Sequence, residues 1–173
     1  MFEFEEKAIR NKDKITYTSD GVKTTIKIDG NKVITNKALN LKPVNIETKV
    51  YPGFATDLQQ PITTLLVMAD GESTVRETIY ENRFQNTIYL NSMGADIIRK
   101  GDTIYVNGPT KLEGKLVRTS DLRAGAALII AGIIATNHTI IRNIEILFRG
   151  YEKPIQKLKQ LNRVWQKYNV LSS

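Results

Sequence analysis

Apolar and polar residues follow two different periods along this chain, and each change of period marks a new predicted element. Residues 44–50 (VNIETKV) alternate and are rich in β-branched side chains, which is the pattern of a half-buried strand. A Pro-Gly turn follows, and an apolar stretch with helical spacing then extends to about Ala69. Thr56 and Asp57 are both candidate N-caps of this helix, because each has a glutamine three residues later.

Short β-type runs precede this stretch. Residues 15–18, 22–28 and 32–35 are separated by two turn sequences that contain Asp-Gly, and together they predict a small meander. Residues 3–11 place their apolar side chains on one face and predict a short amphipathic helix.

Strand-like and helix-like segments alternate through the rest of the chain. In order, they are a strand at 72–79, a helix at 83–93 ending at Gly94, a hairpin of 96–99 and 103–106, a strand at 115–119, an apolar helix at 122–135, a strand at 138–144, a basic helix at 152–161 and a strand at 163–168. This order favours a layered α/β fold, in which helices pack against sheets.

Two stretches of the chain resemble each other. Asp57 corresponds to Asp121 at a spacing of 64 residues, and Arg83 corresponds to Arg149 at a spacing of 66. A repeat of this size indicates one supersecondary unit used at least twice, with equivalent side chains directed at a common surface. The helix at 122–135 is apolar nearly all round, so we expect the helices inside and the sheets outside.

Composition narrows the possible classes of protein. With 173 residues, 41% of them apolar and 25% charged, the chain is expected to form a globular domain or two small lobes. The absence of cysteine excludes disulfides, cysteine-ligated zinc and thiol catalysis, and a single histidine, His138, excludes a site with several histidines. No N-terminal apolar run is long enough for a signal peptide, and the longest apolar stretch, Ala124 to Ala135, is too short to span a bilayer. A cytoplasmic protein without metal or cofactor and without membrane contact is therefore expected.

The net charge of +7 is concentrated near the end of the chain, where residues 120–173 carry eight basic and three acidic side chains. Such a charge suits a phosphate-bearing ligand or nucleic acid, or simply a solvated surface. The basic residues lack the interleaved aromatic residues typical of nucleic-acid grooves, so nucleic-acid binding is not expected.

The repeated acids and arginines are the candidate chemistry. Asp57 and Asp121 begin apolar helices, Arg83 and Arg149 lie near the start of the second helix of each repeat, and Arg123 lies in the first turn after Asp121. Arginine presents a planar fork to phosphate or carboxylate, and a nearby carboxylate can accept the proton of a hydroxyl. If these residues are functional, they bind an anionic phosphorylated substrate. If they are only structural, the acids are N-caps and the arginines form surface ion pairs.

Five motifs resemble those of the UDP-N-acetylglucosamine 1-carboxyvinyltransferase family, enolpyruvyl transferases of the EPSP synthase-like superfamily that act in peptidoglycan synthesis. They are YPGFATDLQQ from Tyr51, ETIYENRF from Glu77, MGA from Met93, TSDLRA from Thr119 and RGYE from Arg149. The resemblance implies an inside-out α/β barrel built of βαβαββ units. It also implies that residues 1–173 form part of one domain, with a partial first unit at 1–42, a second at 43–108 and a third at 115–168.

The resemblance also implies roles for individual residues. Asp57 matches the aspartate that binds the sugar and accepts the proton of its 3′-hydroxyl when this oxygen attacks phosphoenolpyruvate. Ile79 matches a backbone contact to the UDP-sugar, and Asp121 matches an aspartate near the closing loop. The three arginines at 83, 123 and 149 match those that bind the phosphate and carboxylate of phosphoenolpyruvate.

This chain departs from the family pattern in several places. Phe148 stands where an aspartate is usual, and Asn86 where a histidine is usual. The other domain, which carries further substrate contacts, is expected to be missing, as is at least one strand of the first unit, so turnover by this chain alone is not expected. Two alternatives remain: a non-catalytic module that binds a partner or itself through exposed apolar surface, and the same-fold relative that acts on shikimate phosphate. A nucleic-acid binder is a weak third interpretation, because the basic residues lack interleaved aromatic residues.

Overall fold

The computed structural model describes residues 14–19, 22–29, 32–35 and 40–160. The chain divides into two compact units, Met1–Asn40 and Leu41–Ser173. The first contains a three-stranded antiparallel sheet in the order β1-β2-β3, formed by β1 (Lys14–Ser19), β2 (Val22–Asp29) and β3 (Lys32–Thr35). This sheet confirms the predicted meander, whereas the helix predicted at 3–11 lies outside the described residues.

The second unit is built around a mixed four-stranded sheet, in the order β4-β5-β7-β6. Its strands are β4 (Asn45–Glu47), β5 (Gly71–Arg76), β6 (Asp96–Lys100) and β7 (Thr103–Gly108). The predicted hairpin is confirmed as β6 and β7, which pair antiparallel around Gly101 at φ +62°. β4 and β5 are parallel, and a helix connects them.

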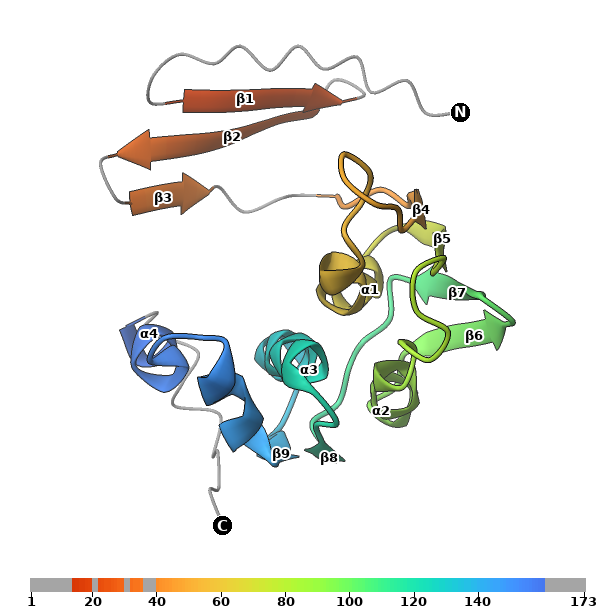
Figure 1. Cartoon of the computed structure of the whole chain (residues 1–173), viewed down its shortest axis with the longest axis vertical. Helices are drawn as coiled ribbons and strands as arrows, with labels where there is room; N and C mark the ends of the chain where they lie inside the picture. Colours follow the sequence, from red (N-terminus) through yellow and green to blue (C-terminus); the bar gives the residue numbers. More distant parts are fainter. Residues whose placement is uncertain (1–13, 20–21, 30–31, 36–39, 161–173) are drawn as a thin grey trace. The chain divides into compact units, whose positions relative to one another are not determined.

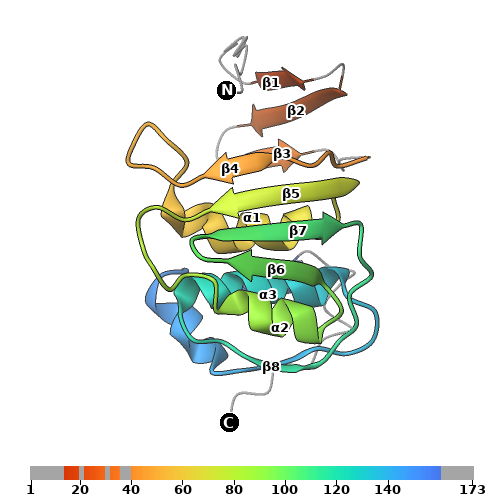
Figure 2. The ribbon, with the colours of Figure 1, turned by 90° about the vertical axis from the view of Figure 1, so that its right-hand side faces the viewer.

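Helices make up much of the rest of the second unit. They are the α-helices α1 (Gln59–Leu66), α2 (Asn86–Ser92), α3 (Leu122–Ile134) and α4 (Pro154–Gln160), with the 3₁₀ helices η1 (Thr56–Leu58) and η2 (Ile144–Arg149). Figure 1 views α1, α2 and α3 end-on, with β5, β6 and β7 along one side and β8 and β9 beyond α3; in Figure 2 the same sheet lies in front of these helices.

The most apolar helix lies in the middle of the second unit. Ala127, Leu128 and Ala131 of α3 are fully buried, and α3 contacts α1, α2, β9 and η2. A helix with apolar residues on nearly every side requires packing partners around it, because no face of it favours water. The described second unit therefore has a mixed α/β fold with a largely buried helix, as predicted; closure of its sheets into a barrel stays a prediction.

The same βαβ arrangement occurs twice in the second unit. β4, α1 and β5 form one copy; the other consists of β8 (Leu116–Arg118), α3 and β9 (Ile140–Arg142), with β8 and β9 again parallel. The two connecting helices pack against each other, and Thr64 Oγ1 of α1 donates a 3.4 Å hydrogen bond to the carbonyl of Ala127 in α3. This arrangement agrees with the internal repeat read from the sequence, whose exact unit boundaries stay a prediction.

Several local expectations were wrong. Neither Thr56 nor Asp57 caps a helix with its side chain, and η1 precedes α1, whose N-cap is Leu58. The segment 138–144 forms a strand only at its centre, because Asn143 takes a left-handed conformation at φ 59° and starts the unpredicted η2. The strand predicted at 163–168 lies outside the described residues.

The helices of the described residues can also be compared with the length needed to span a membrane. None of them has both the length and the apolar character needed to cross a bilayer.

Candidate anion-binding site

An acid and two arginines from distant parts of the sequence meet at one surface of the second unit. Oδ1 of Asp57 accepts hydrogen bonds from Nε of Arg123 at 2.6 Å and from Nη1 of Arg83 at 2.9 Å. The Asp57 side chain is 61% exposed, whereas those of Arg123 and Arg83 are 31% and 14% exposed. The guanidinium groups are therefore partly buried beneath a carboxylate that faces the solvent.

The repeated βαβ arrangement explains why these residues meet. Asp57 lies in η1 just before α1, and Arg123 lies in the first turn of α3. At the other end, Met68 follows α1 and Ile134 ends α3, and these two residues line one hollow. The two helices therefore run in the same direction, with both N-termini at the site, where the positive end of each helix adds to the attraction for an anion.

A second layer of polar groups holds Arg83. Thr56 Oγ1 accepts a 3.0 Å hydrogen bond from Arg83 Nη1 and donates a 2.8 Å hydrogen bond to Oε2 of Glu77. The guanidinium carbon of Arg83 also lies 4.0 Å from the centre of the Tyr80 ring. We refer to Thr56, Asp57, Glu77, Arg83 and Arg123 as the Asp57 cluster.

The ion pairs change the protonation chemistry of the Asp57 cluster. The hydrogen bond from Arg123 is the largest cause that lowers the pKa of Asp57 below its ordinary value, and the hydrogen bond from Arg83 is the second. The hydrogen bond to Asp57 in turn raises the pKa of Arg123. Asp57 is therefore ionised at neutral pH, but its arginine partners weaken it as a base while they remain bound to it. An anion that took over these guanidinium groups would restore the basicity of the carboxylate.

Not every predicted site residue joins the Asp57 cluster. Asp121 is the N-cap of α3, because its Oδ1 accepts hydrogen bonds from the backbone of Arg123 at 2.8 Å and of Ala124 at 3.0 Å. Ile79 is 38% exposed in the loop after β5. Arg149 is exposed at the end of η2 and, within the described part of the chain, forms no hydrogen bond or ion pair with the cluster.

Two members of the Asp57 cluster were not predicted as site residues. Thr56 was considered only as an N-cap, and Glu77 was part of a predicted strand. The available signal was that Glu77 opens the ETIYENRF motif, which also contains Arg83. The bonds from Thr56 to Glu77 and to Arg83 depend on tertiary packing, which a pattern of neighbouring residues does not encode.

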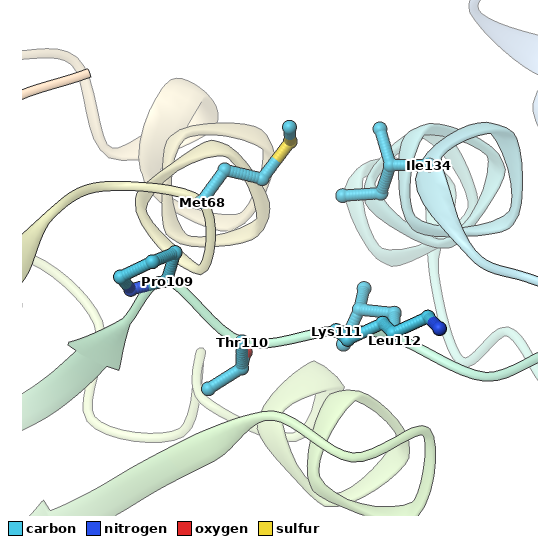
Figure 3. A pocket seen from close by; sticks show the side chains of 6 residues that line it. All are labelled: Met68, Pro109, Thr110, Lys111, Leu112 and Ile134. Atoms are coloured by element: carbon cyan, nitrogen blue, oxygen red, sulfur yellow. The ribbon is translucent and has the colours of Figure 1, made fainter. Parts of the chain in front are cut away.

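Two hollows of the second unit are lined by residues outside the Asp57 cluster. One, of about 320 Å³, lies at the C-terminal ends of α1 and α3; Figure 3 shows Met68 and Ile134 on either side of it, with residues 109–112 below. The other, of about 580 Å³, is lined by residues that include Phe148 and Tyr151. Among the described residues, no group of three His, Cys, Asp or Glu side chains is placed to hold a metal ion.

Comparison with known proteins identifies the family of this chain. The family model for EPSP synthase (3-phosphoshikimate 1-carboxyvinyltransferase) matches residues 12–158. The chain therefore belongs to the EPSP synthase family, as the motif resemblance predicted.

Similar proteins specify the relationship further. The chain is 50% identical over 141 residues to UDP-N-acetylglucosamine 1-carboxyvinyltransferase 2 of Streptococcus thermophilus, which covers 82% of this chain and 33% of that protein. It is 47% identical over the same length to UDP-N-acetylglucosamine 1-carboxyvinyltransferase 1 of Streptococcus agalactiae. The chain spans about a third of the length of these curated relatives, so it is a partial homologue of an enolpyruvyl transferase.

A solved structure shares the fold. The enolpyruvyl transferase NikO from Streptomyces tendae matches with a TM-score of 0.71 and 25% sequence identity, over 80% of this chain and 32% of that protein. The mixed α/β fold thus matches an enolpyruvyl transferase structure, as expected.

Proposed function

We propose that this chain is a portion of an enolpyruvyl transferase that transfers enolpyruvate from phosphoenolpyruvate to the 3′-hydroxyl of UDP-N-acetylglucosamine, the first committed step of peptidoglycan synthesis. The observation that carries the proposal is the shared Oδ1 of Asp57, which accepts hydrogen bonds from Arg123 at 2.6 Å and from Arg83 at 2.9 Å. The names of the relatives support the choice of substrates over shikimate phosphate.

In this proposal the arginines bind phosphoenolpyruvate. Its phosphate and carboxylate take the guanidinium groups of Arg83, Arg123 and Arg149, which suit anions through their forked donors. Arg149 is exposed at the end of η2, and η2 contacts α3, the helix that carries Arg123. Ile79 and Asp121 are proposed to contact the UDP-sugar, with Asp121 also holding the start of the helix that carries Arg123.

Asp57 is the proposed base. Once an anion binds Arg83 and Arg123, the Asp57 carboxylate loses its two cationic partners and its pKa rises toward the ordinary value. It then accepts the proton of the 3′-hydroxyl as this oxygen bonds to the central carbon of phosphoenolpyruvate. The acid that protonates the methylene carbon is proposed to belong to the other domain of the whole enzyme. Phosphate then leaves the central carbon while the new methyl group gives up a proton to a base, which restores the double bond in the enolpyruvyl ether.

The isolated chain is proposed not to turn over. Its length is about a third of that of the relatives, and the other domain is proposed to supply the remaining substrate contacts. Within the whole enzyme, we propose that these residues belong to an inside-out α/β barrel domain with units at 1–42, 43–108 and 115–168. No cofactor is proposed, and the cytoplasmic location stays a prediction.

A binding experiment tests the anion site. Isothermal titration of the chain with phosphoenolpyruvate is expected to show binding that Arg83→Gln and Arg123→Gln each weaken at least tenfold, as expected for a charge-assisted hydrogen bond of about 1.5–3 kcal/mol. Arg142→Gln, at an exposed position of β9, is the matched control and is expected to leave the affinity unchanged. If Arg83→Gln and Arg123→Gln bind phosphoenolpyruvate as tightly as Arg142→Gln does, the proposed anion site is refuted.

A phosphate-release assay tests the proposed lack of turnover. The isolated chain with both substrates is expected to release no phosphate above background. Release that disappears in the Asp57→Asn variant would show that the chain is catalytic by itself and would refute this part of the proposal.

Exposed apolar residues support a second candidate, a partner-binding module. Leu65 and Met68 of the α1 region are 40% and 43% exposed, and Tyr51 is 95% exposed. Groups of this kind on a partial chain suit an interface. Sedimentation velocity at several concentrations tests this candidate: association that Leu65→Ser and Met68→Ser abolish supports it, and a concentration-independent monomer refutes self-association.

A further inference from the structure

Glu77 is a buried acid that accepts hydrogen bonds from four donors. Its side chain follows β5, and the residue is 4% exposed. Oε1 accepts from Thr48 Oγ1 at 2.8 Å, from the backbone N–H of Ile79 at 2.9 Å and from that of Tyr80 at 3.1 Å. Oε2 accepts from Thr56 Oγ1 at 2.8 Å. These contacts connect the end of β4, the start of η1 and the loop after β5.

All four partners of Glu77 are neutral groups, two threonine hydroxyls and two backbone N–H groups. Burying a carboxylate is costly unless hydrogen bonds replace its hydration, and four donors do so here. Among the described residues, no lysine or arginine forms a salt bridge with Glu77; the nearest connection to a cation passes through the hydroxyl of Thr56 to Arg83.

The hydroxyl of Thr56 transmits the effect of Glu77. A threonine hydroxyl has one proton, and in Thr56 this proton is donated to Glu77. The oxygen therefore presents its lone pairs to Arg83 Nη1, which donates to it at 3.0 Å and also to Asp57 Oδ1 at 2.9 Å. The Tyr80 ring, whose backbone N–H is held by Glu77, lies against the same guanidinium group.

We propose that Glu77 is a positioning residue: by holding the hydroxyl of Thr56, it fixes the orientation of the guanidinium group of Arg83. Glu77 also accepts the hydrogen bond of the backbone N–H of Ile79. The backbone group that Ile79 can offer to a ligand is then its carbonyl oxygen, so the ligand must present a hydrogen-bond donor to it. This inference rests on the proposed function, because it assumes that Arg83 binds the anion.

Rotation of the Arg83 guanidinium group, followed by ¹⁵N NMR, tests the proposal without any ligand. The Arg83 signals are assigned as those missing from Arg83→Lys. In Glu77→Gln, a single amide oxygen replaces two carboxylate oxygens, so some of the four donors lose their acceptor and Thr56 no longer directs its proton away from Arg83. Rotation about the Cζ–N bonds is expected to be about tenfold faster in Glu77→Gln and in Thr56→Val, the loss expected for one charge-assisted hydrogen bond.

Two further variants separate positioning from general support of the fold. Thr56→Ser keeps the hydroxyl and is expected to restore the slow rotation of the wild type. Thr48→Val removes a different donor to the same carboxylate and is expected to lower the melting temperature while leaving the rotation of Arg83 unchanged. The proposal is overturned if Thr48→Val accelerates rotation as much as Thr56→Val does, or if neither Glu77→Gln nor Thr56→Val accelerates it.

Titration with inorganic phosphate, as a separate measurement, distinguishes failure of the proposal from failure of the proposed function. Phosphate binding that Glu77→Gln and Thr56→Val weaken several-fold supports both. If phosphate does not bind while the rotation results are as expected, the positioning role of Glu77 holds and the anion site is refuted. If phosphate binds through Arg83 but Glu77→Gln and Thr56→Val leave both affinity and rotation unchanged, the positioning role is refuted alone.

Discussion

Arg123 Nε donates a 2.6 Å hydrogen bond to Oδ1 of Asp57, a residue 66 positions earlier in the chain. This contact joins the N-terminal ends of the two helices of the repeated βαβ arrangement. It also means that, without a ligand, the carboxylate proposed as the base occupies a guanidinium group proposed to bind the substrate anion.

Removing the Asp57 carboxylate is expected to strengthen anion binding. Because Asp57 competes with a ligand for Arg83 and Arg123, Asp57→Asn is expected to raise the affinity for inorganic phosphate about five- to tenfold at fixed ionic strength. Titration calorimetry of the two proteins measures this change.

The matched control for that experiment is Asp102→Asn. Asp102 also pairs with an arginine, Arg76, at 2.9 Å, but this pair lies outside the Asp57 cluster. The control is expected to bind phosphate as the wild type does. Weaker binding by Asp57→Asn than by the wild type would show that Asp57 helps to bind the anion instead of competing with it.

The lowered pKa of Asp57 predicts a pH-dependent contribution to stability. Because the pKa is lower in the folded state, the contribution is fully present above the unfolded value of about 3.9 and is lost as pH falls through the folded value. The side chain is 61% exposed, so solvent screening limits this contribution to less than about 1 kcal/mol.

Urea unfolding between pH 2 and pH 7 measures this contribution. The wild type is expected to exceed Asp57→Asn in the free energy of unfolding at pH 6, with the difference shrinking toward zero at the acid end. A difference that stays constant over the whole range would contradict the assignment to the ionised carboxylate.

Two glycines of α3 are expected to respond differently to alanine. A Cβ at Gly132 would lie 3.4 Å from Thr139 Cβ, an ordinary contact, so Gly132→Ala is expected to stabilise the protein by up to about 1 kcal/mol through helix propensity. A Cβ at Gly125 would lie 3.2 Å from both Leu147 Cγ and Thr119 Oγ1, which are buried and must shift. Thermal unfolding is expected to rank Gly125→Ala below Gly132→Ala; the reverse order would mean that the glycine at 125 is not needed for close packing.

The buried face of α3 predicts a large loss of stability. Leu128 is fully buried, so Leu128→Ala is expected to lower the free energy of unfolding by about 2–5 kcal/mol, through lost burial and the cavity left behind. Leu116→Ala, at a residue that is 57% exposed, is expected to change it by less than about 0.5 kcal/mol. Chemical denaturation compares the two, and similar losses would place α3 outside the core.

Regular side-chain periodicity predicted the elements that form regular structure. The strands β1 to β3 and the β6–β7 hairpin follow the predicted runs closely, and α3 ends within a residue of its predicted limit. These elements depend on neighbours in the sequence, on turn glycines such as Gly101, and on the side chain of Asp121, which is both the predicted and the observed cap of α3.

The interactions of Thr56 and Asp57 were not predictable in the same way. Both are good N-cap residues, and the capping-box pattern was present, yet Thr56 bonds to Glu77 and Arg83, and Asp57 bonds to Arg83 and Arg123. A short polar side chain adopts the partner that packing brings within reach, and a charged partner outweighs a backbone N–H.

The amino-acid sequence by itself determined the family, the repeated βα order, the apolar helix that must be buried, and the positions of the acids and arginines, because each of these depends on residue type and local spacing. Only the tertiary structure decided which of those charges meet. It brought Asp57 to Arg83 and Arg123, left Arg149 exposed with no hydrogen bond to Asp57 among the described residues, and buried Glu77 behind Thr56. The physical reason is that hydrogen bonds and ion pairs form over a few ångströms of space, and the packing of α1 against α3 sets those distances between residues far apart in the chain.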